Sequence, residues 1–177
     1  MKRVFIAIML LFSLQAAAQK TQIVAHRGYW DTPNNAQNSI TALKTAQQIP
    51  VYGSEFDVNM TSDGVMVVSH GPKLESIPDV QKATYKEVKK VRLKNGEKVP
   101  TLKQYLKQGK KGNIKLIFEL KVHPAGEIEN EAVLKSVKMV KKLILQFISM
   151  MKLMMPSNVA VNVDHGRFPP FLRFDSL

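Results

Sequence analysis

Short apolar segments alternate with amphipathic ones along most of this sequence, and this alternation limits the folds that the chain can adopt. Strand-like runs are expected at 22–25, 53–58 and 114–120, and helices at 38–48, 102–107 and 127–147. The resulting order of strands and helices is typical of a parallel sheet whose faces are covered by helices. An open doubly wound sheet and a (β/α) barrel both fit this order.

The first residues have the composition of an export signal. Lys2 and Arg3 precede an apolar run from Val4 to Leu14, and three alanines follow before Gln19. Those 11 apolar residues are too few for a membrane-spanning helix, which needs roughly 20. We therefore expect a signal peptide over 1–18, cleavage after Ala18, and an exported chain, periplasmic or secreted, without a stable membrane anchor.

Polar side chains gather where the expected strands end. The residues concerned are His26, Arg27, Glu55, Asp57, His70, Glu119 and Lys121. In parallel α/β folds the carboxyl ends of the strands are where chemical sites are built. Taken singly, each residue fits a structural role, such as a hydrogen-bonded histidine or an exposed ion pair. Taken together, they favour a functional site.

Three of these residues offer carboxylate oxygens. Glu55 and Asp57 are two positions apart, so on a strand they point to the same side. Two carboxylates that close repel each other unless a proton or a cation lies between them. With Glu119 they form an all-oxygen donor set, which favours Mg²⁺ or Ca²⁺ over zinc. The chain has no cysteine, which excludes thiolate metal sites, thiol nucleophiles and disulfides.

The net charge of +12 is concentrated in one segment. Between Lys82 and Lys121 there are 13 Lys/Arg and 3 Asp/Glu. Such a segment can attract an anionic substrate, or it can simply be a solvated surface. Aromatic residues are sparse there and no nucleic-acid-binding motif accompanies it, which favours the solvated surface and no nucleic acid partner.

Three longer stretches carry a family resemblance: AHRGYWDTPNNAQNSITAL, GSEFDVNMTSDGVMVVSH and IFELK. Over about 23–121 the sequence resembles the N-terminal half of the glycerophosphodiester phosphodiesterase family. The resemblance implies a (β/α) barrel of the TIM type that hydrolyses a small-molecule phosphodiester to glycerol 3-phosphate and an alcohol. It implies an acid/base pair (His26 and His70), phosphate contacts (Arg27 and Lys121) and ligands for Ca²⁺ or Mg²⁺ (Glu55, Asp57 and Glu119).

Two features depart from the family pattern. Gln37 stands where the family has a glutamate, which removes a charge and is expected to weaken metal binding or change the preferred metal. A complete barrel takes about 250 residues, whereas cleavage after Ala18 leaves 159. We therefore expect an incomplete barrel over 19–142 and, as a hypothesis, a divergent and non-native tail over 143–177 from a truncated or frameshifted gene.

Two other interpretations compete with an active phosphodiesterase. One is an inactive fragment of such an enzyme that at most binds phosphate. The other is a basic protein that binds an anionic polymer or membrane surface through its lysine-rich segment. The sequence leaves the oligomeric state open.

Overall fold

The computed structural model describes residues 22–124 and 126–152, and side chains of its last helix as far as residue 142. Its elements are β1 (Val24–Ala25), α2 (Ile40–Ala46), β2 (Gly53–Met60), β3 (Met66–Val68), α3 (Tyr85–Val88), α4 (Leu102–Gly109), β4 (Lys115–Leu120) and α5 (Glu127–Lys152). The expected signal peptide and most of the expected tail lie outside the described residues.

Strand β2 forms the centre of the sheet. It pairs in parallel with β1 on one edge and with β4 on the other, where the register runs from Gly53↔Lys115 to Val58↔Leu120. The carboxyl end of β2 also pairs with β3, antiparallel, across the turn that contains Asp63 and Gly64. The three strands expected to be parallel are therefore parallel, and β3 is a hairpin partner of β2.

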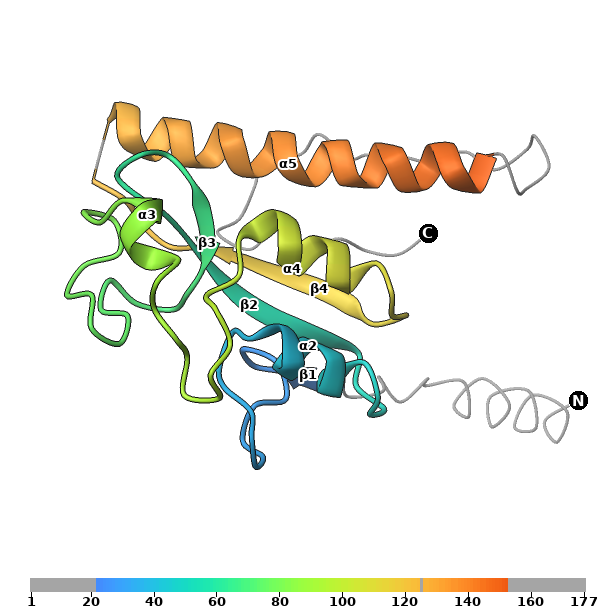
Figure 1. Cartoon of the computed structure of the whole chain (residues 1–177). Coiled ribbons are helices and arrows are strands. Elements are labelled where there is room, and N and C mark those ends of the chain that lie inside the picture. Colours follow the sequence, from blue (N-terminus) through green and yellow to red (C-terminus); the bar gives the residue numbers. More distant parts are fainter. Residues whose placement is uncertain (1–21, 125, 153–177) are drawn as a thin grey trace, which may run out of the picture.

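Helices α2 and α4 begin close to the expected residues 38 and 102, each after a residue whose side chain caps the helix. The Ser39 hydroxyl accepts a hydrogen bond from the Ala42 amide at the start of α2, and Thr101 forms a capping box with Gln104 at the start of α4. Figure 1 shows α2 and α4 on the same side of the sheet and α5 as the longest helix, running past them. Helix α5 extends beyond the expected residue 147 to Lys152.

The main core lies between the sheet and these helices. Phe56, Val58 and Met60 alternate along β2 and are buried on the helix side. The Phe56 ring stacks on Tyr105 of α4, with centroids 4.5 Å apart, and meets Phe118 of β4 edge-on at 5.5 Å. Because strand side chains alternate, Glu55, Asp57 and Asn59 point to the opposite face.

A second apolar cluster anchors the long lysine-rich connection between β3 and α4. Its buried members include Leu74, Ile77, Val80, Val88, Val91 and Leu93, and they pack with Val67 of β3. This connection is therefore folded against the sheet, although its only helix among the described residues is the short α3.

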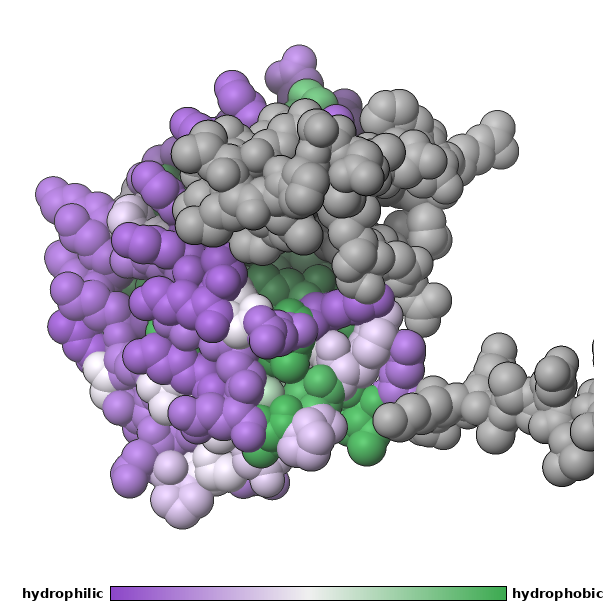
Figure 2. All heavy atoms as spheres, turned by 90° about the vertical axis from the view of Figure 1, so that its right-hand side faces the viewer, coloured by the Kyte–Doolittle hydropathy of each residue, from purple (hydrophilic) through white to green (hydrophobic). Residues whose placement is uncertain are grey.

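The sheet is open in the described part of the chain. There, β1 and β4 each pair only with β2, so each has a free outer edge. Figure 2 shows hydrophobic surface next to a broad hydrophilic region on the face seen from the right of Figure 1. Apolar side chains at β1 and on α5 are exposed, among them Ile23, Val24 and Leu134. No helix among the described residues has both the length and the apolar character to cross a membrane.

Candidate functional site

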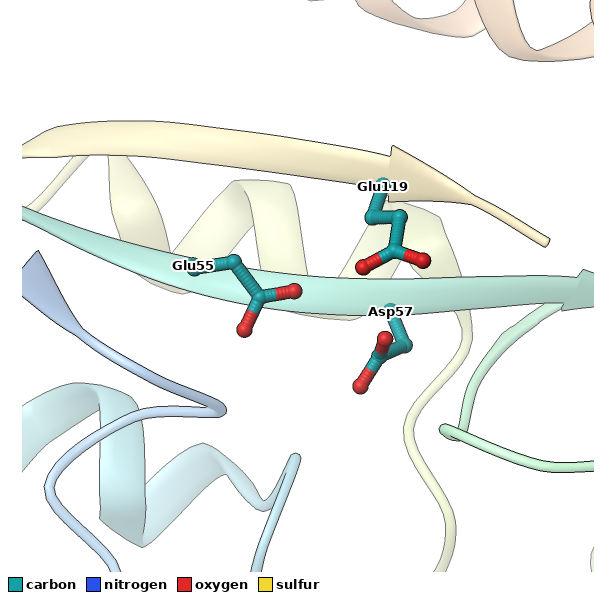
Figure 3. A group of neighbouring side chains, drawn as sticks. All are labelled: Glu55, Asp57 and Glu119. Carbon is teal, nitrogen blue, oxygen red and sulfur yellow. The ribbon is translucent and has the colours of Figure 1, made fainter. Parts of the chain in front are cut away.

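Three of the predicted site residues meet at the centre of the sheet. Glu55 and Asp57 lie on β2, and the β2–β4 register places Glu119 directly beside Asp57. One carboxylate oxygen from each lies within 4.8 Å of the other two. Figure 3 shows the three carboxylates directed to the same side of the sheet, with Glu119 reaching toward Asp57. This arrangement could hold a metal ion.

The Glu55 carboxyl is held in an environment that disfavours its charge. Burial raises its pKa to about 7, and Asp57 and Glu119 add to this effect, while a hydrogen bond from the Arg27 amide opposes it. Its Oε2 accepts that bond at 2.8 Å, whereas Oε1 is buried and has no hydrogen-bond partner among the residues that the structure describes. Glu55 therefore has a free ligand atom that faces two other carboxylates.

Asp57 has the opposite character. It is fully buried, and burial would raise its pKa, but a hydrogen bond from Asn38 and the Lys121 ammonium outweigh this and lower it. Lys121 Nζ lies 2.7 Å from Asp57 Oδ1 and also contacts Glu119. Arg27 Nε lies 3.4 Å from Asp57 Oδ2, an ion pair without hydrogen-bond geometry. Asp57 is therefore ionised between two cations.

The loop after β1 is pressed against β2. Arg27 and Gly28 have positive φ angles of 60° and 79°, and the Gly28 amide donates to the Glu55 carbonyl at 3.2 Å. A Cβ at Gly28 would lie 2.6 Å from the Cβ of Ala42, so only glycine fits this approach. His26 Nε2 consequently lies 3.8 Å from Glu55 Oε2, with most of its imidazole exposed.

Gln37 contacts Arg27. Its Oε1 accepts a hydrogen bond from Arg27 Nη1 at 2.8 Å. The neutral Gln37 amide thus fixes the Arg27 guanidinium by a hydrogen bond and leaves its positive charge uncompensated by residue 37. The expected effect of Gln37 on metal binding stays a prediction.

His70 lies at the rim of the same site, after β3. The preceding Ser69 amide donates to the Asp57 carbonyl at 3.1 Å. Partial burial lowers the pKa of His70, Arg27 and Lys121 lower it further, and Asp57 opposes them. His70 also lines a cavity of about 540 Å³ together with Trp30, Gln37, Lys73 and Lys94. All seven predicted residues therefore surround one region.

Several residues of the site were not predicted from the sequence. Asn38 lies at the expected start of a helix, and its side-chain amide donates a hydrogen bond to Asp57. Asn59, the next residue in the row formed by Glu55 and Asp57, bonds to the Ser69 carbonyl at 2.8 Å. The period of two along β2 could have indicated Asn59. His123 does not enter the site: it is buried and accepts a hydrogen bond from the Met60 amide at 2.8 Å.

Comparison with known proteins identifies the family. The model of the glycerophosphoryl diester phosphodiesterase family matches residues 26–163. The chain belongs to this family. A solved glycerophosphodiester phosphodiesterase from Parabacteroides distasonis is 51% identical with a TM-score of 0.67, over 70% of this chain and 52% of that one. A curated glycerophosphodiester phosphodiesterase from Caldanaerobacter subterraneus is 37% identical over 94 residues, 47% of this chain and 38% of its own length.

A third relative was solved with a ligand. An Oleispira antarctica phosphodiesterase, in complex with its product sn-glycerol-3-phosphate, is 27% identical with a TM-score of 0.58, over 68% of this chain and 52% of that one. The chain thus spans about half the length of these solved family members. These solved family members are barrels of the TIM type, and the sheet of this chain is open among the residues that the structure describes. The expected fold, an incomplete (β/α) barrel, is therefore confirmed.

Proposed function

We propose that this chain hydrolyses glycerophosphodiesters to glycerol 3-phosphate and an alcohol. The observation that carries the proposal is the convergence of three carboxylates with Arg27 and Lys121 at the strand ends, inside the segment matched by the phosphodiesterase family. The substrate class follows the names of the relatives, and the product follows the Oleispira complex.

The carboxylates fit a hard divalent cation. All donors are oxygen atoms, they lie within 4.8 Å of one another, and one of them, Glu55 Oε1, is buried without a hydrogen-bond partner in the described part of the chain. Glu55, Asp57 and Glu119 would hold Ca²⁺ or Mg²⁺. Bound there, the ion would supply Lewis-acid stabilisation of charge on the phosphoryl oxygens.

Arg27 and Lys121 would bind the phosphate. Both are held by Asp57, at 3.4 Å and 2.7 Å, so their positive charges are oriented before the substrate arrives. A phosphodiester resists attack because it is negatively charged, and oriented cations reduce this barrier as charge develops in the transition state. Gln37 keeps the Arg27 guanidinium in place without cancelling its charge.

The two histidines would transfer the protons. One imidazole accepts a proton from the attacking hydroxyl, and the other donates one to the leaving alkoxide. Attack by water gives glycerol 3-phosphate directly, whereas attack by the substrate's own hydroxyl gives a cyclic phosphate that water then opens to glycerol 3-phosphate. The lowered pKa of His70 favours its neutral form near pH 7, and this is the form that accepts a proton. We also propose that residues 1–18 direct export of the chain and that its substrate is a small soluble molecule.

Hydrolysis of glycerophosphocholine by the purified chain tests the proposal. Glycerol 3-phosphate is measured with Ca²⁺, with Mg²⁺ and with EDTA, for the wild type and for His70→Ala and Glu55→Gln. The matched control is Glu131→Gln, because Glu131 is an exposed α5 glutamate whose ion pair is with Lys135, away from the site. We expect metal-dependent hydrolysis that both site variants lose and the control retains. A folded wild-type chain that releases no product would refute the proposal.

A further inference from the structure

Asn38 makes two hydrogen bonds to Asp57, which lies on a different element. Its Nδ2 donates to Asp57 Oδ2 at 2.9 Å, and its Oδ1 accepts from the Asp57 backbone amide at 3.2 Å. Asn38 is 3% exposed and Asp57 is fully buried. One side-chain amide therefore contacts both the backbone and the carboxylate of a single residue.

The backbone contact compensates for the shortness of β1. Strand β1 pairs with β2 only as far as Ala25↔Ser54, so within the described ranges the Asp57 amide has no strand neighbour on that edge. The opposite edge of β2 is taken by β4. Because a buried amide without an acceptor is costly, the Asn38 Oδ1 takes the place that a longer β1 would have filled.

The contact to the carboxylate determines where Asp57 points. Asp57 Oδ1 faces Lys121 at 2.7 Å, and Oδ2 faces Asn38 at 2.9 Å and Arg27 at 3.4 Å. Asn38 is the one neutral donor among these partners, since both others are cations. It can hold Oδ2 in place without competing, by charge, with a metal ion.

The backbone of Asn38 explains why asparagine suits this position. Its φ is +58°, a left-handed conformation that asparagine and glycine adopt more readily than other residues. Its amide also donates to the Arg27 carbonyl at 3.0 Å. Asn38 thus links the loop of His26 and Arg27 to the strand that carries two of the carboxylates.

We propose that Asn38 is a positioning residue that orients Asp57 for cation binding. The inference rests on the proposed function, because the cation site belongs to it. Partners that orient a metal ligand typically alter metal affinity about 10- to 100-fold when they are removed. The proposal therefore predicts an effect on metal binding that a purely structural residue would not have.

The test compares Asn38→Gly with Asn34→Gly. Asn34 is a matched control because it is exposed, lies in the same loop and also has a positive φ, of 61°. Binding of Tb³⁺, a luminescent probe for oxygen-donor cation sites, is titrated for the full chain and both variants, and thermal unfolding is recorded alongside. We expect affinity to fall about 10- to 100-fold in Asn38→Gly and to be unchanged in Asn34→Gly. Equal affinity of a folded Asn38→Gly and the wild type would overturn the proposal.

A second measurement needs no variant and no metal. In the wild-type chain with EDTA, amide hydrogen exchange should be slower for the Asn38 side-chain NH₂ than for that of Asn34. Equal exchange rates would also overturn the proposal. If the wild type binds no Tb³⁺, the cation site of the proposed function fails, and the exchange comparison still decides whether Asn38 holds Asp57.

Discussion

Lys121 contacts two of the three carboxylates that would bind a cation. Its ammonium lies 2.7 Å from Asp57 Oδ1 and also contacts Glu119. The burial of its stem would lower the pKa of Lys121, but both carboxylates outweigh this and raise it, so the side chain is charged. In the metal-free chain, this charge compensates the carboxylates that the cation would otherwise neutralise.

Lys121→Met should therefore separate metal affinity from catalysis. Affinity for Ca²⁺ should rise because a competing positive charge is removed, whereas kcat/KM should fall about 100-fold because the proposed phosphate contact is lost. Without metal, the free energy of unfolding should drop by about 3 kcal/mol, since Asp57 stays buried with fewer partners. Calorimetric titration and urea unfolding in EDTA measure these effects. The control is Lys82→Met, at an 86% exposed lysine paired with Asp79, which should leave Ca²⁺ affinity, kcat/KM and unfolding free energy unchanged. Weaker Ca²⁺ binding by Lys121→Met would contradict the prediction.

Glu55 should make the stability of the metal-free chain depend on pH. Its pKa is about 7 in the folded chain against an ordinary 4.5, so between these values the folded state holds a proton that the unfolded chain releases. The contribution of Glu55 to the free energy of unfolding is therefore fully present below pH 4.5. It falls by on the order of 3 kcal/mol as the pH rises to 7. The difference in unfolding free energy between Glu55→Gln and the wild type, in EDTA, should grow across this range.

Urea unfolding at several pH values measures that difference. Glu131→Gln is the control, because this exposed glutamate should not show the dependence. A constant difference between Glu55→Gln and the wild type from pH 4.5 to 7 would mean that Glu55 is ionised throughout. Ca²⁺ should remove the dependence, since binding requires the ionised carboxylate.

The connections between elements are tied together by a second set of amides. Gln81, in the lysine-rich connection, donates from Nε2 to Asn59 Oδ1 of β2 at 2.8 Å and to the Val122 carbonyl after β4 at 2.9 Å. Asn59 in turn donates to the Ser69 carbonyl. Ser69 precedes His70, and Val122 follows Lys121. The segments that carry these two site residues are thus linked through Gln81.

Gln81→Leu should disturb both segments without touching the carboxylates. We expect a loss of about 1–3 kcal/mol in unfolding free energy, because the buried Asn59 Oδ1 loses its donor. We also expect a lower kcat, with Tb³⁺ affinity unchanged. Steady-state kinetics and Tb³⁺ titration distinguish the two effects. Gln48→Leu, at an exposed glutamine after α2, provides the comparison, and equal kcat in both variants would show that Gln81 does not position the site.

The molecule has an open sheet over the residues that the structure describes, and its outer strands have free edges there. Free strand edges tend to pair with other chains, and apolar side chains are exposed on β1 and just before it: Val24 of β1 is 37% exposed and the preceding Ile23 is 63% exposed. The chain should therefore associate as its concentration rises.

Val24→Lys should weaken that association, because a lysine on an edge strand opposes edge-to-edge pairing. Sedimentation velocity over a concentration series measures it. Val122→Lys is the matched control: Val122 is 83% exposed but lies outside any strand, so this variant should associate like the wild type. A wild-type chain that stays monomeric at every concentration would contradict the prediction.

Much of the fold and site could be read from local patterns. Alternation along 53–58 predicted that Glu55 and Asp57 share a face, and the helix starts expected at residues 38 and 102 lie close to the first residues of α2 and α4. Those features depend on interactions within a few residues, such as strand alternation and side-chain caps. The family motifs then indicated which polar strand ends belong to one site.

The tertiary structure decided how the site residues act on one another. The contact of Asn38 with Asp57 spans 19 residues, and that of Gln81 with Val122 spans 41. The register of β2 with β4 sets Glu119 beside Asp57, and burial, with the neighbouring carboxylates, raises the pKa of Glu55. Such contacts depend on which strands pair and in what register. Local periodicity carries no information about either, so only the folded chain shows that the surroundings lower the pKa of Asp57 and raise that of Glu55.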